Sequence, residues 1–276
     1  MLPKPAATVL LFRACALSSS AEDYEILLVQ RHSKSPFMGG AYVFPGGKVE
    51  SSDNKLADGL AEQYNLDAEV ASYAIAACRE CFEEAGVLLC DPKPDDWQSW
   101  RERVQENADA FSQGLEEHRL ELCLHKIFFW SHWITPSFEG RRYDTRFFIT
   151  EVPQQEQEEI DHIETTQSIW LGPSAALGAN QNQEILLMPP TVHLLDELRA
   201  YPTRRELLQA AQNREVAAIL PRVNQVEGQL AIILPWDPLY ANSEGEGLAF
   251  EASHPLRQTP SRIVMRNNLW TTESPT

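Results

Sequence analysis

Short apolar blocks at the start of the chain predict buried strands. Residues 6–13 and 24–31 are apolar and rich in strand-forming side chains. Residues 41–44 form a third block of this kind, and Pro-Gly-Gly follows at 45–47. We therefore expect three strands, the last of which ends in a tight glycine turn.

A longer apolar repeat over residues 68–85 has the period of a helix. Five small or apolar side chains form one stripe along it: Val70, Ala74, Ala77, Cys81 and Ala85. Asp67 is a good N-cap, because its carboxylate can accept hydrogen bonds from the first amides of a helix. Gly86 stands where helices commonly end. These signals predict a helix over 68–85.

The rest of the chain contains both strand-like apolar blocks and helix-like apolar repeats. Four more segments have the composition of strands: 87–89, 127–133, 142–150 and 168–171. Three helices are expected, one starting at Pro173 and two over 191–200 and 203–212. Segment 91–126 places tryptophans among charges and indicates one or two amphipathic helices, whereas the acidic segment 153–167 reads as a loop. This mixture favours a single α/β domain with helical insertions.

The charge and the cysteines exclude several function classes. The formal net charge of −17 repels long nucleic acids and anionic membranes. It does not exclude a small anion, because a bound metal and a few arginines can reverse the local field. No apolar run approaches the roughly 20 residues that span a bilayer. The five cysteines are scattered and odd in number, which fits a reducing compartment, and we interpret Cys78 and Cys81 as packing residues.

Three glutamates gather on the predicted helix 68–85. Glu80, Glu83 and Glu84 fall within an arc of about 100°, centred about 120° from the apolar stripe. They are therefore expected to flank the buried face rather than lie in it. Like charges at this spacing repel each other, and hard divalent cations prefer such oxygen ligands. The pattern alone leaves open a solvated acidic face or a metal site.

The letters around these glutamates resemble the Nudix box. Residues 79–87 read Arg-Glu-Cys-Phe-Glu-Glu-Ala-Gly-Val and match its second half, and residues 44–50 resemble its first half. The segment between the halves is longer than usual, so the box is interrupted, with the extra residues at about 54–67. The Gly-Glu pair that usually follows the first half is missing, and either Asp53 or Glu50 could replace that glutamate.

An interrupted box resembles the Nudix branch of the peroxisomal acyl-coenzyme A diphosphatases. The similarity extends through 5–11, 28–31, 40–47, 133–136 and 141–148 and covers residues 5 to about 200. It implies a Nudix fold over 1–276, in which a mixed β-sheet is sandwiched between helices (α/β/α). It also implies a helical insertion at about 91–126 and a C-terminal extension at about 190–276. The peroxisomal C-terminal signal of that branch is absent, so we expect a cytoplasmic protein.

The resemblance implies a Mg²⁺-dependent hydrolase, with Mn²⁺ as an alternative metal. Coenzyme A or acyl-coenzyme A would be cut at its diphosphate into 3′,5′-ADP and (acyl-)phosphopantetheine. Glu83 and Glu84 would be the main ligands, with Glu80 and the carbonyl of Gly47 in addition, and Arg79 would orient a glutamate. The identity of the general base stays open. The candidates are Glu80 and four glutamates of the acidic segment: Glu156, Glu158, Glu159 and Glu164.

Substrate contacts are expected from basic and aromatic side chains near the cleft. Arginine suits a phosphate group, and Arg31, Arg141 and Arg142 are the candidates for the 3′-phosphate. Four aromatic residues could stack on adenine or simply pack the core: Tyr143, Phe147, Trp130 and Trp133. The expected partner is a small nucleotide such as coenzyme A, and a homodimer is compatible with the sequence.

Two alternatives remain at this stage. The same chemistry could act on another nucleotide, such as NADH, ADP-ribose or a capped RNA end. The fold could instead serve as a ligand-binding module without turnover, although a pure binder has no need of three clustered carboxylates.

Overall fold

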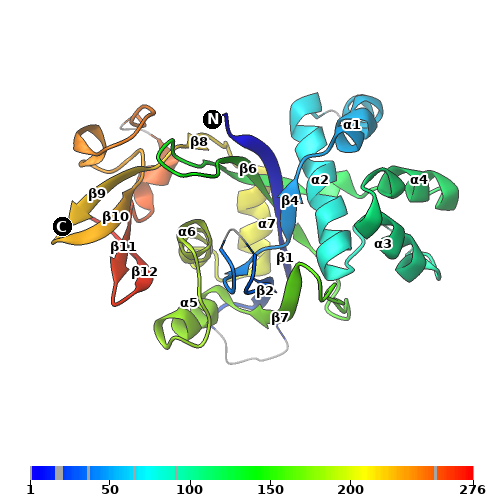
Figure 1. Ribbon diagram of the computed structural model, residues 1–276, viewed down its shortest axis with the longest axis horizontal. Coiled ribbons are helices and arrows are strands. Elements are labelled where there is room, and N and C mark those ends of the chain that lie inside the picture. The colour runs from blue at the N-terminus through cyan, green and yellow to red at the C-terminus, as the bar shows by residue number, and fades with distance from the viewer. Residues whose placement is uncertain are drawn as a thin grey trace.

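The computed structural model describes residues 2–15, 21–35, 38–64, 66–90, 93–251 and 254–275. A mixed β-sheet forms the middle layer (Figure 1). Helices α1 to α4 cover one face, and helices α5 to α7 cover the other together with a second, smaller sheet. This arrangement confirms the expected α/β/α fold class. None of the described helices is long and apolar enough to cross a bilayer.

Strand β1 (Lys4–Ala14) is the centre of the main sheet. It pairs with β6 (Tyr143–Glu151) in parallel and with β2 (Tyr24–Arg31) in antiparallel orientation. Along β1, Val9 and Leu11 pack against one core, while Leu10 and Phe12 pack against the other. Alternation between two buried faces explains why this strand reads as a continuous apolar run.

The remaining strands of this sheet extend it on both sides. They are β3 (Tyr42–Val43), β4 (Gly46–Lys48), β5 (Phe128–Ile134), β7 (Thr165–Leu171) and β8 (Ala218–Ile219). β7 pairs with β2, and β5 joins β6 to the short β8. The predicted strands at 127–133, 142–150 and 168–171 are confirmed. The predicted acidic loop is three residues too long, because β7 already begins at Thr165.

The expected glycine turn at 45–47 is wrong. Gly46 and Gly47 belong to β4, which pairs with β1. Both positions need glycine because the backbone is approached closely. A Cβ at Gly46 would lie 2.4 Å from the carbonyl oxygen of Ala7, and one at Gly47 would lie 2.5 Å from the carboxylate of Glu80.

Helix α2 (Ala68–Ala85) has the predicted bounds. The Asp67 carboxylate accepts hydrogen bonds from the amides of Glu69 and Val70. Gly86 ends the helix in a left-handed conformation with φ 66°. Local capping chemistry therefore fixes both ends of the element that carries the glutamates.

Three further helices pack on the outer side of α2. They are α1 (Ser51–Tyr64), α3 (Trp97–Glu106) and α4 (Asp109–His118). α1 occupies most of the segment that interrupts the box, and α3 and α4 confirm the amphipathic helices expected in 91–126. The strand predicted at 87–89 is wrong: these three residues belong to no strand, and an isolated bridge follows them between Cys90 and Leu122. They are apolar because they are buried among the helices.

The other face of the sheet carries three helices that confirm the sequence prediction. They are α5 (Pro173–Gln181), α6 (Pro189–Leu198) and α7 (Arg204–Gln212). Short 3₁₀ turns occur at Leu124–Lys126, Tyr240–Asn242 and Pro255–Gln258.

The last part of the chain forms a separate antiparallel sheet, which we call the C-terminal sheet. Its strands are β9 (Arg222–Val226), β10 (Gln229–Ile233), β11 (Arg262–Arg266) and β12 (Leu269–Glu273), in the order β12-β11-β10-β9. It lies beyond α6, opposite the side that carries α2 (Figure 1). The sequence did not predict this second sheet.

Candidate active site

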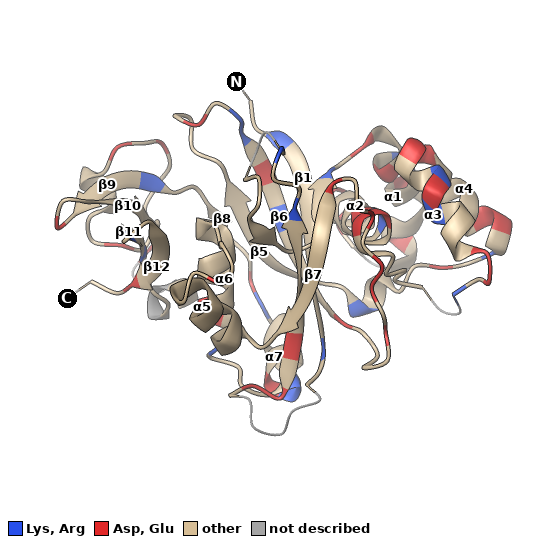
Figure 2. Ribbon diagram, turned by 60° about the horizontal axis from the view of Figure 1, so that its bottom comes forward, with Lys and Arg blue, Asp and Glu red and all other residues tan. Residues whose placement is uncertain are grey.

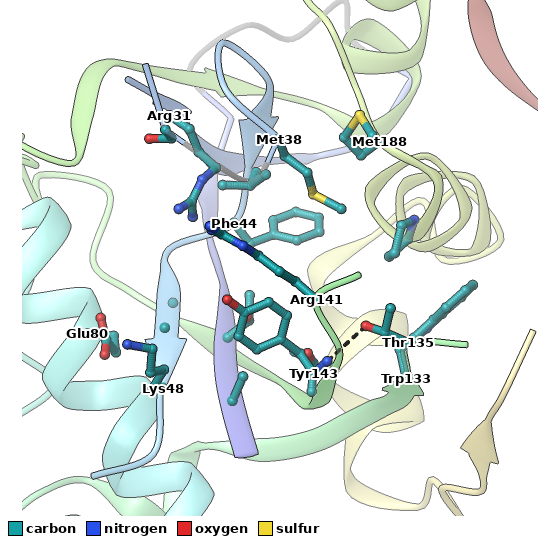
Figure 3. A pocket seen from close by; sticks show the side chains of 18 of the residues that line it. Arg31, Met38, Phe44, Lys48, Glu80, Trp133, Thr135, Arg141, Tyr143 and Met188 are labelled. Atoms are coloured by element: carbon teal, nitrogen blue, oxygen red, sulfur yellow. Dashed lines mark hydrogen bonds between the residues drawn. The ribbon is translucent and has the colours of Figure 1, made fainter. Parts of the chain in front are cut away.

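A cavity of about 1650 Å³ runs between α2 and the C-terminal sheet. Its walls come from β4, the ends of β5 and β6, the start of α6 and one face of the C-terminal sheet. Figure 3 shows Glu80 and Lys48 on one side of it, Arg141 and Tyr143 in the middle, and Trp133 and Met188 on the other side. The cavity therefore joins segments that are far apart in the sequence.

The three glutamates of α2 differ in their surroundings. Glu80 and Glu83 line the cavity, and their side chains are 13% and 22% exposed. Glu84 is buried and accepts a hydrogen bond of 2.9 Å from the amide of Gly46. The expectation that all three flank the buried face is wrong for Glu84. Because β4 and the loop before β7 pack on that side of α2, the buried arc is wider than the apolar stripe.

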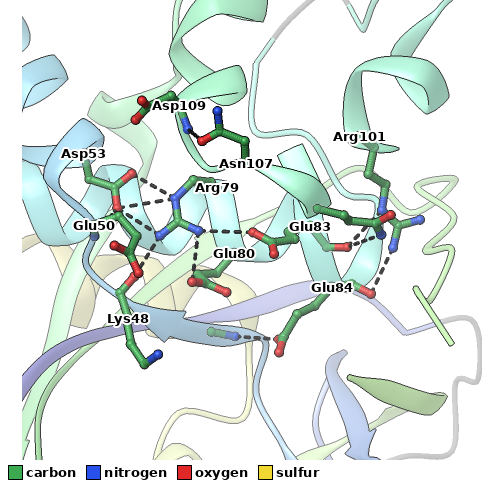
Figure 4. Close-up of polar contacts among 12 residues, drawn as sticks. Lys48, Glu50, Asp53, Arg79, Glu80, Glu83, Glu84, Arg101, Asn107 and Asp109 are labelled. Carbon is green, nitrogen blue, oxygen red and sulfur yellow. Dashed lines mark hydrogen bonds and ion pairs between the residues drawn. The ribbon is translucent and has the colours of Figure 1, made fainter. Parts of the chain in front are cut away.

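Arg79 connects the glutamates to helix α1 (Figure 4). Its Nη1 donates to Glu80 at 3.0 Å and to Glu83 at 3.1 Å. Its Nε and Nη2 donate to the carboxylate of Asp53 at 3.0 and 2.9 Å, and Nη2 also donates to the carbonyl oxygen of Lys48 at 2.7 Å. One guanidinium thus contacts three carboxylates.

The same contacts distinguish Asp53 from Glu50, the two residues that could replace the missing glutamate of the box. Asp53 is buried, contacts Arg79 directly and also accepts a hydrogen bond from the amide of Glu50 at 2.8 Å. Glu50 instead lines the cavity. Asp53 is therefore the residue that the structure brings to the Arg79 side chain.

Burial and mutual repulsion disfavour the ionised forms of the carboxyl groups on α2. Burial raises the pKa of Glu80 to about 8, and the charge of Glu83 adds to this while Arg79 opposes it. Burial and the charge of Glu80 likewise raise the pKa of Glu84, and burial raises that of Glu83. A cation at this position would relieve the repulsion.

The donor set fits a hard divalent cation. Carboxylate oxygens are the ligands that Mg²⁺ prefers, and the absence of a side chain at Gly47 leaves its backbone next to the Glu80 carboxylate. Among the described residues, no three acidic, histidine or cysteine side chains already converge as a closed ligand set. Glu83 is turned toward Arg79 and Glu84 toward Gly46.

The four glutamates of the acidic segment end up in different places. Glu164 lines the cavity, and its charge raises the pKa values of Glu80, Glu83 and Glu84. Glu158 instead accepts hydrogen bonds from Ser168 and Trp170. Glu156 forms a salt bridge of 3.5 Å with Lys93, and the backbone amide of Glu159 bonds to Ala85. Of the four, Glu164 is the one that borders the cavity.

The predicted substrate residues are only partly brought together. Arg31, Arg141 and Tyr143 line the cavity. Arg142 does not line the cavity: its Nε donates to the carbonyl oxygen of Thr135 at 2.9 Å and its Nη2 lies 3.8 Å from Glu246. Arg142 thereby ties the loop before β6 to the C-terminal part of the chain.

The aromatic candidates divide in the same way. Trp133 and Phe147 line the cavity together with Tyr143. Trp130 is fully buried, and the guanidinium of Arg214 lies 4.0 Å from the centre of its ring. Trp130 is a core residue, since its face is already covered.

Three further basic residues belong to the site. Lys34 and Lys48 line the cavity. Lys48 lies within residues 44–50, which resemble the first half of the box, so the sequence contained a signal for its place at the site. Arg101 of α3 donates to the carbonyl oxygens of Glu83 and Glu84 at 3.0 and 3.1 Å. Its sequence context gives no sign of this contact.

Cys78 and Cys81 are packing residues, as expected. Both are buried and free. Burial raises the pKa of both thiols, which disfavours the reactive thiolate.

Comparisons with known proteins show which family the chain resembles. The family profile of the NUDT19 Nudix domain matches residues 57–198. The chain is 30% identical to the acyl-coenzyme A diphosphatase NUDT19 of Xenopus laevis, over 80% of this chain and 73% of the relative. It is 27% identical to the acyl-coenzyme A diphosphatase NUDT19 of Homo sapiens, with the same two coverages.

A solved structure shows the same fold. The NUDIX hydrolase from Alicyclobacillus acidocaldarius superimposes with a TM-score of 0.65 at 23% identity and covers 75% of this chain and 96% of its own. The fold, the Arg79-centred carboxylates and the sequence matches lead to one conclusion: the chain belongs to the Nudix hydrolase family, in the group defined by the NUDT19 Nudix domain.

Proposed function

We propose that this protein is a Mg²⁺-dependent diphosphatase that cleaves coenzyme A and acyl-coenzyme A into 3′,5′-ADP and (acyl-)phosphopantetheine. The observation that carries the proposal is the excess of carboxylate over arginine on α2, at one end of a large cavity whose next section is basic. The relatives that carry the name acyl-coenzyme A diphosphatase support this substrate class.

The proposed metal site uses Glu80, Glu83 and Glu84, with the carbonyl of Gly47 as a further oxygen. A bound Mg²⁺ would neutralise the diphosphate oxygens and position a water for attack. Arg79 would hold Glu80 and Glu83 in place through its two charge-assisted hydrogen bonds. Mn²⁺ has similar preferences for oxygen ligands and would serve the same site.

Proton removal from the attacking water falls to one of two carboxylates. Glu164 lines the cavity without a place in the proposed ligand set. Glu80 is the alternative, because it also lines the cavity. We favour Glu164, because a carboxylate that holds the metal is less free to accept a proton.

The basic section of the cavity next to the carboxylates would hold the phosphate groups of the substrate, including the 3′-phosphate of its nucleotide. Arg31 and Arg141 line this section and supply charge for the 3′-phosphate. Tyr143 lies beside Arg141 in Figure 3 and would contact the phosphopantetheine arm, which leaves the diphosphate on the side opposite the nucleotide.

The rest of the surface argues against long RNA as a substrate. Figure 2 shows acidic residues on α3 and α4, and Glu102, Glu116 and Glu117 on these helices are exposed, in keeping with the net charge of −17. Such a surface repels a polyanion. The five cysteines are odd in number and scattered along the chain, which supports a reducing compartment, and we propose that this is the cytoplasm.

Product analysis by chromatography and mass spectrometry tests the proposal. The protein is incubated with Mg²⁺ and, separately, with coenzyme A, acetyl-coenzyme A, NADH and ADP-ribose. We expect 3′,5′-ADP and the matching phosphopantetheine from the first two substrates. Cleavage of NADH or ADP-ribose alone would show that the substrate is another nucleotide and not coenzyme A. No cleavage of any compound would indicate a binding module.

A matched pair of variants ties the activity to the site. Glu83→Gln removes a charge that faces the cavity and should abolish turnover while the melting temperature without metal is retained. Glu116→Gln removes a charge from the exposed side of α4 and should leave turnover unchanged. Equal activity in both variants would rule out the carboxylates as the metal site.

A further inference from the structure

The C-terminal sheet has two different faces. Along β10, Ala231 and Ile233 are buried against Tyr240 on one face. Leu230 and Ile232 alternate with them and therefore lie on the opposite face. Both of these residues line the cavity. The C-terminal sheet thus closes one face with a small core of its own. Its other face joins the core around α6 through Ile263 and Trp270 and lines the active-site cavity with Leu230 and Ile232.

Apolar side chains from neighbouring segments extend this face. Val223 of β9 is paired directly with Ile232, and Met188 and Phe138 also line the cavity. Leu230 and Phe138 are each 47% exposed. Large apolar side chains left exposed at a cavity indicate an apolar ligand. We call these five residues the apolar wall.

The cavity changes character along its length. Figure 3 shows the change from the carboxylate side near Glu80, through Arg141 and Tyr143, to Met188. Acidic side chains border the far section, since Glu139 follows Phe138 directly and Glu244 is bonded to Val223 through its backbone. That section is therefore suited to an uncharged apolar group and not to a phosphate.

The C-terminal sheet is hydrogen-bonded to helices α5 and α6. Asn180 of α5 donates to the carbonyl oxygen of Trp270 at 3.3 Å, and Thr272 donates to Asp196 of α6 at 2.9 Å. The wall is consequently preformed, which reduces the entropy that binding would cost.

We propose that the apolar wall binds the acyl chain of an acyl-coenzyme A substrate. The proposal rests on the function proposed above and assigns to the C-terminal sheet the choice between free and acylated coenzyme A. An adenine ring would need hydrogen-bond partners, which Leu230, Ile232 and Val223 cannot offer through their side chains. A methylene chain needs only apolar contact.

The test compares kcat/KM for coenzyme A, octanoyl-coenzyme A and dodecanoyl-coenzyme A. The variant is Leu230→Asp, which places a charge on the half-exposed wall without opening the core. The control is Leu248→Asp, because Leu248 is 87% exposed and is not among the residues that line the cavity. We expect Leu230→Asp to lower kcat/KM for dodecanoyl-coenzyme A by about tenfold and to leave coenzyme A unchanged. The control should match the wild type on all three substrates.

Two results would overturn the inference while the proposed function stands. In the first, Leu230→Asp and the wild type depend on chain length in the same way. In the second, Leu230→Asp loses activity on coenzyme A and dodecanoyl-coenzyme A in equal proportion. A wild-type protein that cleaves none of the three compounds would instead overturn the proposed function itself.

Discussion

Arg79 of α2 and Asp53 of α1 form an ion pair in which both side chains are only 2% exposed. The contact is bidentate and joins the helix that interrupts the Nudix box to the helix that completes it. The inserted segment therefore contributes a partner to the central arginine of the site. Without this partner, the charge of Arg79 would be available only to Glu80 and Glu83.

Replacing Asp53 should affect stability and metal binding together. We expect Asp53→Ala to lower the free energy of unfolding by about 3 kcal/mol, because it leaves a buried guanidinium without its main partner. Arg79 should then bind Glu80 and Glu83 more tightly and weaken Mg²⁺ binding. Chemical denaturation and Mg²⁺ titration measure the two effects. Asp58→Ala, on the exposed side of α1, is the control and should show neither effect.

Mg²⁺ should stabilise the folded protein by mass action. At a concentration of 100 times its Kd, a ligand that binds only the folded state adds about 2.7 kcal/mol to the free energy of unfolding. We expect the melting temperature to rise with Mg²⁺ and the rise to disappear in Glu83→Gln. A rise of the same size in Glu83→Gln would mean that the ion binds elsewhere.

Arg101 should support the active site through the backbone of α2. It is buried, and its two hydrogen bonds hold the carbonyl groups of Glu83 and Glu84. We expect Arg101→Gln to lower the free energy of unfolding by about 2 kcal/mol and to weaken Mg²⁺ binding. Arg103→Gln on the same helix breaks only the exposed pair with Glu117 and should change little. Equal effects of both changes would contradict the assigned role.

The choice of general base can be tested in the acidic segment. Glu164→Gln should lower kcat by about 100-fold or more if Glu164 accepts the proton, with little change in the melting temperature or in KM. Glu159→Gln is the control, because this side chain is exposed and does not line the cavity. If Glu164→Gln keeps the wild-type kcat, Glu80 becomes the proposed base.

His193 should make the stability depend on pH. It is buried between the rings of Trp133 and Trp236. Burial lowers its pKa below the ordinary value, although Glu197 and Asp196 oppose the shift. The neutral form is therefore favoured in the folded state, so its contribution is complete above the unfolded pKa of about 6.5. That contribution is lost as the pH falls below this value.

The measurement is the melting temperature between pH 8 and pH 5. His193→Gln removes the titrating group, so its melting temperature should fall less steeply over this range than that of the wild type. Parallel curves for the two proteins would show that His193 does not carry the effect.

The sequence by itself determined the elements whose signals are local. Helix α2 follows from its apolar period, the Asp67 cap and Gly86, all of which act within one or two turns. The strands β1, β2, β5 and β6 follow from short blocks of strand-forming residues. The box letters likewise indicated which helix carries the glutamates, because those letters are contiguous.

The tertiary structure alone decided the rest, because burial depends on what packs against an element from the outside. The apolar stripe of α2 did not reveal that β4 covers Glu84. The residues 87–89 are apolar because helices cover them, which a periodic pattern cannot separate from a strand. Contacts that carry the site also join distant segments, such as Arg101 with Glu83 and Leu230 with the cavity. Such pairings are set by the packing of the whole chain and leave no local mark in the sequence.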